Sequence, residues 1–245
     1  MGKNKSSFIA KAGILAAIVS GLAAVLSGTG TRFEFWNFRT GLTMLRWAAY
    51  GGLASAVLSL IGLVAGLRSA ASRSVIISLL GFFLGAALVA VPLNWLRIAK
   101  SVPPIHDITT DTSNPPQFAA ILPLRKNALN PPEYGGLAVA AKQLKAYPDI
   151  VPLMLNISPD MAFDKALSIA RKMGWKIIDG NQSEGRIEAS DTTFWFGFKD
   201  DIVIRITRAD SGSRIDIRSV SRVGKSDVGA NAKRIRGFLR EMKKP

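Results

Sequence analysis

The chain contains no cysteine and a single histidine, His106. Without cysteine it has no disulfide framework, no thiol nucleophile and no thiolate ligand for a metal. Carboxylates are scarce in the first hundred residues, where Glu34 is the one acidic side chain. Charge of either sign is missing from three stretches, residues 12–31, 47–67 and 74–96. Much of the formal net charge of +15 therefore flanks apolar segments, and it does not by itself indicate nucleic-acid binding.

The three uncharged stretches each have close to the ~20 residues that an α-helix needs to cross the hydrocarbon of a bilayer. A helix also satisfies its own backbone hydrogen bonds in lipid. We therefore predict that residues 1–100 form three transmembrane helices, with a lipid bilayer as their partner. Lysines before the first stretch also occur in signal peptides, but no small-x-small cleavage site follows, which favours a retained anchor. No ionisable side chain lies in the middle of a stretch, which argues against a transporter or a pump.

Small residues recur at every fourth position in these stretches and predict close approach of helix backbones. They are Ala16, Ser20, Ala24 and Gly28 in the first stretch, Gly62 and Gly66 in the second, and Gly81 and Gly85 in the third. Such a face serves either a specific dimer or packing within one chain. We interpret it as packing among the three helices of one chain.

Lysine and arginine residues near the helix ends predict the orientation in the membrane. With the N-terminus inside, five of them lie inside (Lys3, Lys5, Lys11, Arg68 and Arg73) and five outside (Arg32, Arg39, Arg46, Arg97 and Lys100). The first helix usually sets the orientation, and its basic residues mostly precede it. The prediction is therefore a multi-pass protein of the bacterial inner (cytoplasmic) membrane with a periplasmic soluble domain.

Residues 101–152 are rich in proline and other turn formers, which predicts an extended strap with one short helix at residues 137–147. His106, Asp107 and Asp111 in this strap are candidates for a general base or a metal site, because imidazole and carboxylate suit both tasks. The competing interpretation is a series of turns in which the side chains bond to their own backbone. Adjacent side chains of an extended segment do not converge, so we favour the turns and predict neither a metal nor another cofactor.

Residues 153–245 predict a soluble α+β domain in which an antiparallel sheet packs against helices. One helix is expected over residues 156–174, with Ser158 as its N-cap, and another over residues 227–243. Strands are expected at residues 175–179, 185–190, 193–199, 201–208 and 213–220, between turns rich in Gly, Asn, Asp and Ser.

Alternation along these strands predicts two different faces of the sheet. One is apolar and is expected to meet the helices: Ile187, Phe194, Phe196, Phe198, Ile202, Ile204, Ile206, Ile215 and Ile217. The other is expected to face water: Arg186, Glu188, Trp195, Val203, Arg205, Asp216 and Arg218. Cross-strand pairs of arginine and carboxylate explain most of the charge on the second face.

A dense motif joins the last expected strand to the final helix, from Arg218 to Ile235. It reads Arg-Ser-x-Ser-Arg-x-Gly-x-x-Asp-x-Gly-x-Asn-x-x-Arg-Ile. Through this motif, and through residues 185–189, residues 200–205 and the His106 segment, the chain resembles the domain-of-unknown-function family 1499. The resemblance covers most of residues 101–240. It implies frequent association with a membrane or envelope and carries no agreed activity. Some members have a cysteine-containing segment at His106, which argues against a family-wide catalytic role for this histidine.

The motif also places hydroxyls and basic side chains before a helix N-terminus, where free amides and the helix dipole favour an anion. The candidate ligand-binding residues are Arg218, Ser219, Ser221, Arg222, Asp227, Asn231 and Arg234. An alternative needs no ligand: Ser226 or Asp227 caps the helix, and the arginines pair with Asp200, Asp201 or Asp216. We give this structural explanation the greater weight, because the motif does not match a P-loop.

Three functions are weighed on this basis. The favoured one is a noncatalytic envelope protein whose anchored domain binds an anionic small molecule or a protein of the envelope. The second is a membrane-anchored hydrolase that uses His106, Asp107 and Asp111, and it requires the strap to fold over the motif. The third is nucleic-acid binding, against which stand the interspersed carboxylates and the lack of an aromatic stacking platform. The balance favours binding without enzymatic activity and without a nucleic-acid partner.

Overall fold

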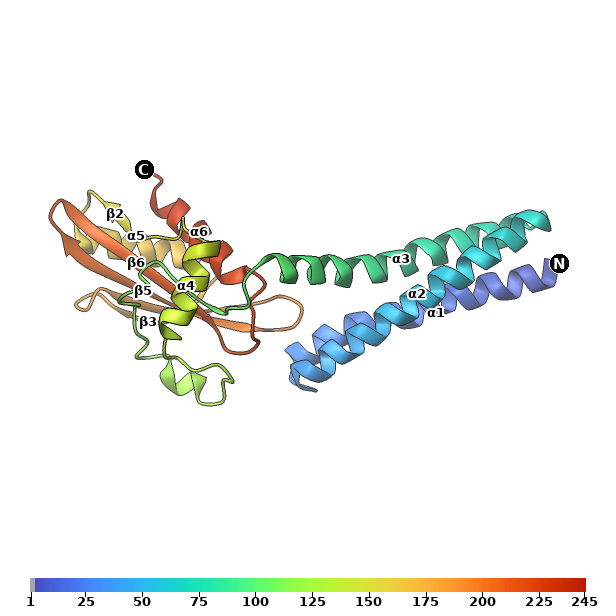
Figure 1. The fold of residues 1–245 in the computed structure, drawn as a ribbon, viewed down its shortest axis with the longest axis horizontal. Helices are drawn as coiled ribbons and strands as arrows, with labels where there is room; N and C mark the ends of the chain where they lie inside the picture. Colours follow the sequence, from blue (N-terminus) through green and yellow to red (C-terminus); the bar gives the residue numbers. More distant parts are fainter. Residues whose placement is uncertain (1–2) are drawn as a thin grey trace. The chain divides into compact units, whose positions relative to one another are not determined.

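The computed structural model describes residues 3–245 (Figure 1). The chain divides into two compact units. A helical unit contains the chain up to Arg97 together with residues 194–197, and a soluble unit contains Ile98–Thr193 and Phe198–Pro245.

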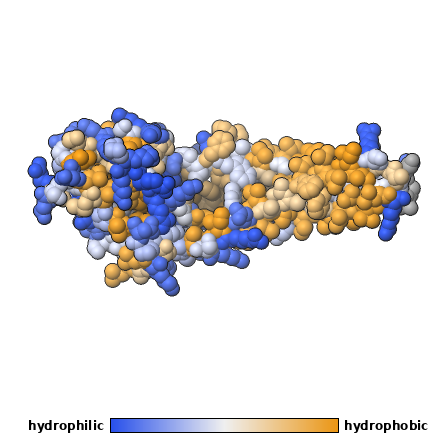
Figure 2. Space-filling model, turned by 90° about the horizontal axis from the view of Figure 1, so that it is seen from above, coloured by the Kyte–Doolittle hydropathy of each residue, from blue (hydrophilic) through white to orange (hydrophobic). Residues whose placement is uncertain are grey.

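The helical unit consists of three long helices, α1 (Lys3–Arg32), α2 (Phe38–Arg68) and α3 (Ser72–Ser101, which ends in the soluble unit). All three are long and apolar enough to cross a membrane, and Figure 2 shows the apolar surface that they present. Asn37 begins α2, because its side-chain oxygen accepts hydrogen bonds from the backbone N–H groups of Arg39 and Thr40. The predicted three-helix region is therefore confirmed as three apolar helices.

Small residues line the contacts among these helices. The hydroxyl of Ser55 on α2 donates to the carbonyl oxygens of Gly13 on α1, at 2.8 Å, and of Gly81 on α3, at 3.2 Å. A Cβ atom at Gly85 would lie 2.5 Å from the carbonyl oxygen of Gly52 and 2.8 Å from the backbone nitrogen of Ala56. The backbones of α2 and α3 can approach this closely only where the residue is glycine. These contacts support the interpretation that the small residues pack helices within one chain.

The soluble unit is built on one antiparallel sheet with the strand order β1-β6-β5-β4-β3, and β2 also pairs with β6. The strands are β1 (Asp107–Thr109), β2 (Leu153–Leu155), β3 (Lys176–Asn181), β4 (Arg186–Thr192), β5 (Lys199–Ala209) and β6 (Gly212–Ser221). The helices are η1 (Leu122–Arg125), α4 (Gly136–Ala146), α5 (Pro159–Lys172) and α6 (Ala230–Met242). The predicted class, an antiparallel sheet packed against helices, is confirmed.

The hydrophobic core lies between one face of the sheet and helices α5 and α6. The six isoleucines predicted for this face are all buried: Ile187, Ile202, Ile204, Ile206, Ile215 and Ile217. Trp175 and Phe238 stack in the same core with their ring centroids 5.6 Å apart. Ser158 caps α5 as predicted, since its hydroxyl accepts from the backbone N–H of Met161.

The strand predicted at residues 193–199 is wrong. These residues form a loop between β4 and β5, and the pairing of the two strands ends at Thr192 and Lys199. Gly197 adopts a positive φ of 67°, which interrupts the extended backbone. Phe194, Phe196 and Phe198 consequently do not join the isoleucines in the core, although they alternate like residues of a strand.

The second face of the sheet does not face water as predicted. Glu188, Val203, Asp216 and Arg218 are all buried on it. Residues 111–135, a part of the predicted strap of residues 101–152, cover this face, because Phe118 and Ile121 pack against Val203 and Val220. From here on, the strap means residues 111–135. The region predicted as an extended strap also supplies β1, whose backbone groups pair with β6. The charged face is therefore an interior, and its charges need partners.

Candidate functional site

Arg218 in β6 is the largest fully buried side chain among the described residues. Its Nε and Nη2 donate to the two carboxylate oxygens of Asp107, at 2.9 and 2.7 Å. Further bonds run from its guanidinium to the carbonyl oxygens of Pro116 and Pro132. The guanidinium also lies over the ring of Phe118, at 5.3 Å from the centroid. All of these partners precede β2 in the chain, so Arg218 fixes the strap and β1 to β6.

Arg222 and Arg125 share a buried carboxylate. Nε and Nη2 of Arg222 donate to the two oxygens of Asp201, at 2.8 and 2.9 Å, and Nη1 of Arg125 donates to the same carboxylate at 2.5 Å. The hydroxyl of Ser190 adds a fourth bond to it. Burial lowers the pKa of Arg125, and Asp201 opposes this shift. Arg222 is thus paired with a buried carboxylate that it shares with Arg125.

A third cluster joins β6 to α6. Arg234 donates to the carboxylate of Asp200 at 2.6 Å and to the hydroxyl of Ser219 at 3.1 Å. The amide of Asn231 accepts from Ser219 at 2.7 Å and donates to the hydroxyl of Ser221 at 3.0 Å. The motif residues are therefore brought together, and they form hydrogen bonds mainly with each other and with buried carboxylates.

Asp227 occupies the N-terminus of α6, where an anion was predicted to dock. Its carboxylate accepts from the backbone N–H groups of Gly229, at 2.9 Å, and of Asn231, at 2.8 Å. Burial raises the pKa of Asp227, and these two backbone bonds oppose the shift. Because these bonds close a turn at residues 227–229, α6 begins at Ala230, three residues later than predicted. The arrangement gives the motif a stabilising role, and ligand binding by its residues stays a prediction.

The three candidate catalytic residues are not assembled into one site. Asp107 is engaged by Arg218, and Asp111 accepts hydrogen bonds from Arg205, at 3.2 Å, and from Arg214, at 2.7 Å. His106 and Asp107 line one cavity, whereas Asp111 lines another of about 230 Å³ together with Arg205 and Arg214. Over residues 3–245 no group of three His, Asp or Glu side chains has an arrangement that could hold a metal ion.

The cavity beside His106, here called the His106 cavity, has a volume of about 450 Å³. Its wall comes from the start of the soluble unit, the strap, α4 and the motif: Pro104, Ile105, His106, Asp107, Asn130, Pro131, Glu133, Gly135, Val139, Lys142 and Lys225. Lys142 and Lys225 are exposed and form no ion pair in the part of the chain that the structure describes. Two exposed lysines against one exposed glutamate, Glu133, give the opening of the His106 cavity a net positive charge.

Sequence reasoning missed Lys142, Glu133 and Asn130 as neighbours of His106. The sequence did draw attention to Lys225, because it lies inside the motif, but nothing in the sequence of α4 indicated a role for Lys142. Tyr134, next to Glu133, has a buried hydroxyl without a hydrogen-bond partner in the described chain. Burial, with the nearby charge of Asp107, raises the pKa of Tyr134 to about 12, so its phenol stays neutral and can donate a hydrogen bond.

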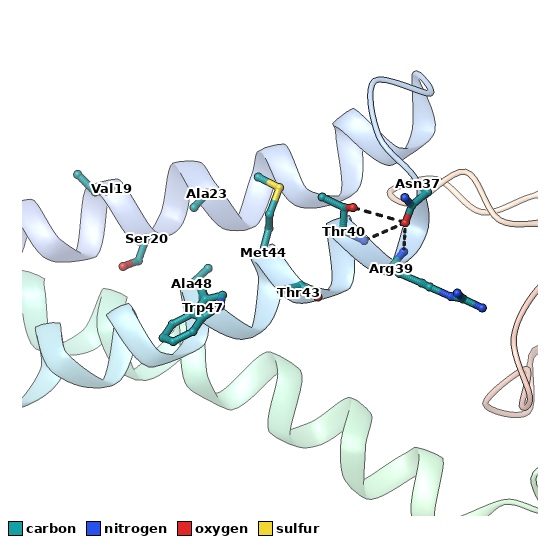
Figure 3. Close-up of a pocket in the computed structure, with 10 residues that line it drawn as sticks. All are labelled: Val19, Ser20, Ala23, Asn37, Arg39, Thr40, Thr43, Met44, Trp47 and Ala48. Carbon is teal, nitrogen blue, oxygen red and sulfur yellow. Dashed lines mark hydrogen bonds between the residues drawn. The ribbon is translucent and has the colours of Figure 1, made fainter.

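The helical unit has a groove of its own, of about 600 Å³, between α1 and α2. Figure 3 shows its lining residues, with Asn37 bonded to the start of α2 at one end. Apart from Arg39 and a few hydroxyls, the lining is apolar or small, including Val19, Ala23, Met44 and Trp47. A groove of this composition suits a hydrocarbon chain and has no group for acid–base chemistry.

The fold thus defines an α+β unit joined to three apolar helices, with a lysine-lined cavity and a buried arginine motif. The model of the family described as a protein of unknown function, DUF1499, matches residues 107–242. The chain belongs to this family. The match begins at Asp107, the carboxylate that holds Arg218, so both partners of the buried ion pair lie inside it. None of the curated proteins matches the chain.

Proposed function

We propose that this protein is a noncatalytic binding protein of the bacterial inner membrane. In this proposal α1, α2 and α3 span the bilayer, the soluble unit is periplasmic, and the His106 cavity takes an anionic small molecule. The length and composition of the three helices support the anchor. The assignment to the envelope rests on the basic residues that precede the first uncharged stretch, residues 12–31.

The observation that carries the binding proposal is the pair of unpaired lysines at the His106 cavity. The arginines of the motif are each paired with a buried carboxylate, whereas Lys142 and Lys225 remain available to an incoming anion. The imidazole of His106 can add a hydrogen bond to such a ligand, whereas the side-chain amide of Asn130 already donates to the carbonyl oxygens of Ser221 and Gly224. A volume of about 450 Å³ also falls in the range of small-molecule pockets.

Binding without chemistry is favoured because the groups that hydrolysis would require are occupied. Both oxygens of Asp107 accept from Arg218, and among the described residues no hydrogen bond joins Asp107 to the imidazole of His106. Nucleic acid is also a poor ligand, because much of the basic charge that would bind its phosphates is already paired with carboxylates. On the outer face of α6, Arg236 forms two hydrogen bonds with Asp149, at 2.6 and 2.7 Å.

A protein of the envelope is the second candidate partner, and α4 supplies the observation that favours it. The predicted helix has Leu137, Ala140, Ala141 and Leu144 in one register, but only Ala140 of these is buried. Leu137 is 89% exposed and Leu144 is 52% exposed. Two such leucines on one helix suit an apolar contact with another protein.

Thermal unfolding of the full chain in a nonionic detergent tests the anion proposal, with inorganic phosphate and succinate as probes. Binding to the folded state raises the Tm as the probe concentration rises. We expect the rise with at least one probe, and its loss in Lys142→Ala and Lys225→Ala. Lys145→Ala is the matched control, because Lys145 is exposed on the same helix outside the cavity. No rise with either probe, or a rise that survives both cavity variants, would contradict the proposal.

A further inference from the structure

The loop between β4 and β5 concentrates aromatic side chains at one end of the sheet. Residues 193–198 read Thr-Phe-Trp-Phe-Gly-Phe, with four aromatic residues and no charge. Phe194 is 90% exposed, more than any other large apolar side chain of the described residues. Asp191 and Lys199 supply the first charges on either side. Phe196 is buried, and the indole N–H of Trp195 donates to the carbonyl oxygen of Val25 at 3.2 Å, so Phe194 is the ring left in water, where a covering surface is expected.

The loop is closed by its own backbone. The N–H of Thr193 donates to the carbonyl of Phe198, and the N–H of Phe198 donates to the hydroxyl of Thr193, both at 2.9 Å. Gly197 supplies the positive φ that the turn needs. Because the turn is preformed, presenting its rings to a partner requires little further ordering of the chain.

The aromatic composition of the loop and its short tether to α3 both indicate a lipid bilayer as its partner. Aromatic side chains, tryptophan above all, accumulate at the level of the lipid headgroups, where the ring is buried and its polar edge stays hydrated. Only residues 102–106 separate the end of α3 at Ser101 from the start of β1 at Asp107. Six peptide units span at most roughly 22 Å, so the soluble unit is tethered close to the bilayer that α3 would cross.

We propose that the β4–β5 loop, residues 193–198, inserts the exposed ring of Phe194 into the interface of the lipid bilayer. This inference rests on the proposed membrane anchor, and it adds a second, peripheral attachment of the soluble unit to the membrane. Phe194 is the inserted residue, Trp195 stays on Val25 and Trp95, and Asp191 and Lys199 stay at the rim. A second copy of the chain or another protein covering the loop is the competing outcome.

The absence of cysteine allows a direct test in the full chain, because each introduced cysteine is the only thiol. Phe194→Cys carries a nitroxide spin label in vesicles of equal amounts of phosphatidylcholine and phosphatidylglycerol. Oxygen, which concentrates in lipid, and a water-soluble nickel complex compete as relaxing agents. Ser211→Cys is the aqueous control, since the β5–β6 turn lies at the other end of β5. Phe83→Cys on α3, where the native side chain is 65% exposed, is the lipid control.

We expect the ratio of oxygen to nickel accessibility at position 194 to be several-fold higher than at position 211 and to approach that at position 83. Equal ratios at positions 194 and 211 would overturn the inference. So would a label at position 194 shielded from both agents, because that result means a covering protein. A nickel-accessible label at position 83 would instead overturn the membrane anchor itself, so the two failures are distinguishable.

Discussion

Arg218 illustrates how a charged side chain becomes part of an interior. It has no exposed surface, and Asp107 accepts two of its hydrogen bonds. Removing one partner of a buried ion pair leaves the other charge without compensation and typically costs about 3–5 kcal/mol. We expect Arg218→Met to lower the free energy of unfolding by about that amount, measured by chemical denaturation of the full chain in detergent with tryptophan fluorescence.

Arg208→Met is the matched control for this prediction. Arg208 lies on β5 with an exposed side chain, and the same substitution there should change the free energy of unfolding by less than about 0.5 kcal/mol. If the two variants were equally stable, the buried pair would contribute nothing that an apolar side chain cannot replace.

The sequence alone could identify the motif but not the partners of its arginines. Asp107 and Arg218 are 111 positions apart, and no periodicity links them. On β6 the alternation of Asp216 and Arg218 with isoleucines is typical of a strand with one wet face. The strap excludes water from this face. Its prolines predict an extended segment but not the surface on which that segment packs.

At the scale of elements, Glu188 holds the strap. Its buried carboxylate accepts from the backbone N–H groups of Ala119, Ala120 and Ile121, at 2.8, 3.1 and 2.8 Å. In Glu188→Gln one acceptor becomes a donor that faces an N–H group, at a cost of about 1–3 kcal/mol. We expect faster tryptic cleavage after the exposed Lys126 in the strap, followed by mass spectrometry.

Glu184→Gln provides the comparison, because Glu184 is exposed in the turn between β3 and β4. It makes the same chemical change without touching the strap. Cleavage after Lys126 that is as slow in Glu188→Gln as in Glu184→Gln would show that the strap is held by its apolar contacts alone.

The contact between α2 and α3 offers a second prediction at this scale. A methyl group at Gly85 would press on the backbone at Gly52 and Ala56, which cannot yield without separating the helices. Gly21 on α1 has nothing within 4 Å of the added atom. We therefore expect Gly85→Ala to lower the Tm of the helices in detergent, followed by far-ultraviolet circular dichroism.

Gly21→Ala should leave the Tm unchanged or raise it, because alanine is the better helix former by about 1 kcal/mol. A lower Tm in both variants would point to a general intolerance of alanine in these helices. It would then contradict the specific contact of Gly85 with α2.

Elements were predictable where local chemistry decides them. Ser158 and Pro159 begin α5 through capping and a fixed φ, and the isoleucines of β5 and β6 alternate toward one core. The same alternation failed at Phe194, Phe196 and Phe198. There Gly197 and the end of the β4–β5 pairing, which depends on a partner strand, override the pattern.

For the whole molecule, the family match separates the unit that the family model describes from the three apolar helices. It begins at Asp107 and ends at Met242, so it covers the sheet, the strap and the arginine motif but none of the three apolar helices. The uneven distribution of charge predicts a boundary near residue 100, and this boundary stays a prediction. The sequence could not predict the His106 cavity, because Lys142 and Lys225 reach His106 only through the packing of α4 and the motif.

The side of the membrane on which the soluble unit lies decides which anions it can meet. The proposed three spans are an odd number, so they would place the two ends of the chain on opposite sides. In cells with a permeabilised outer membrane, we expect a membrane-impermeant maleimide to label Ser211→Cys before lysis and Asn4→Cys only after it. The reverse order would place the His106 cavity in the cytoplasm and make cytoplasmic anions its ligands. Labelling of both before lysis would contradict three spans.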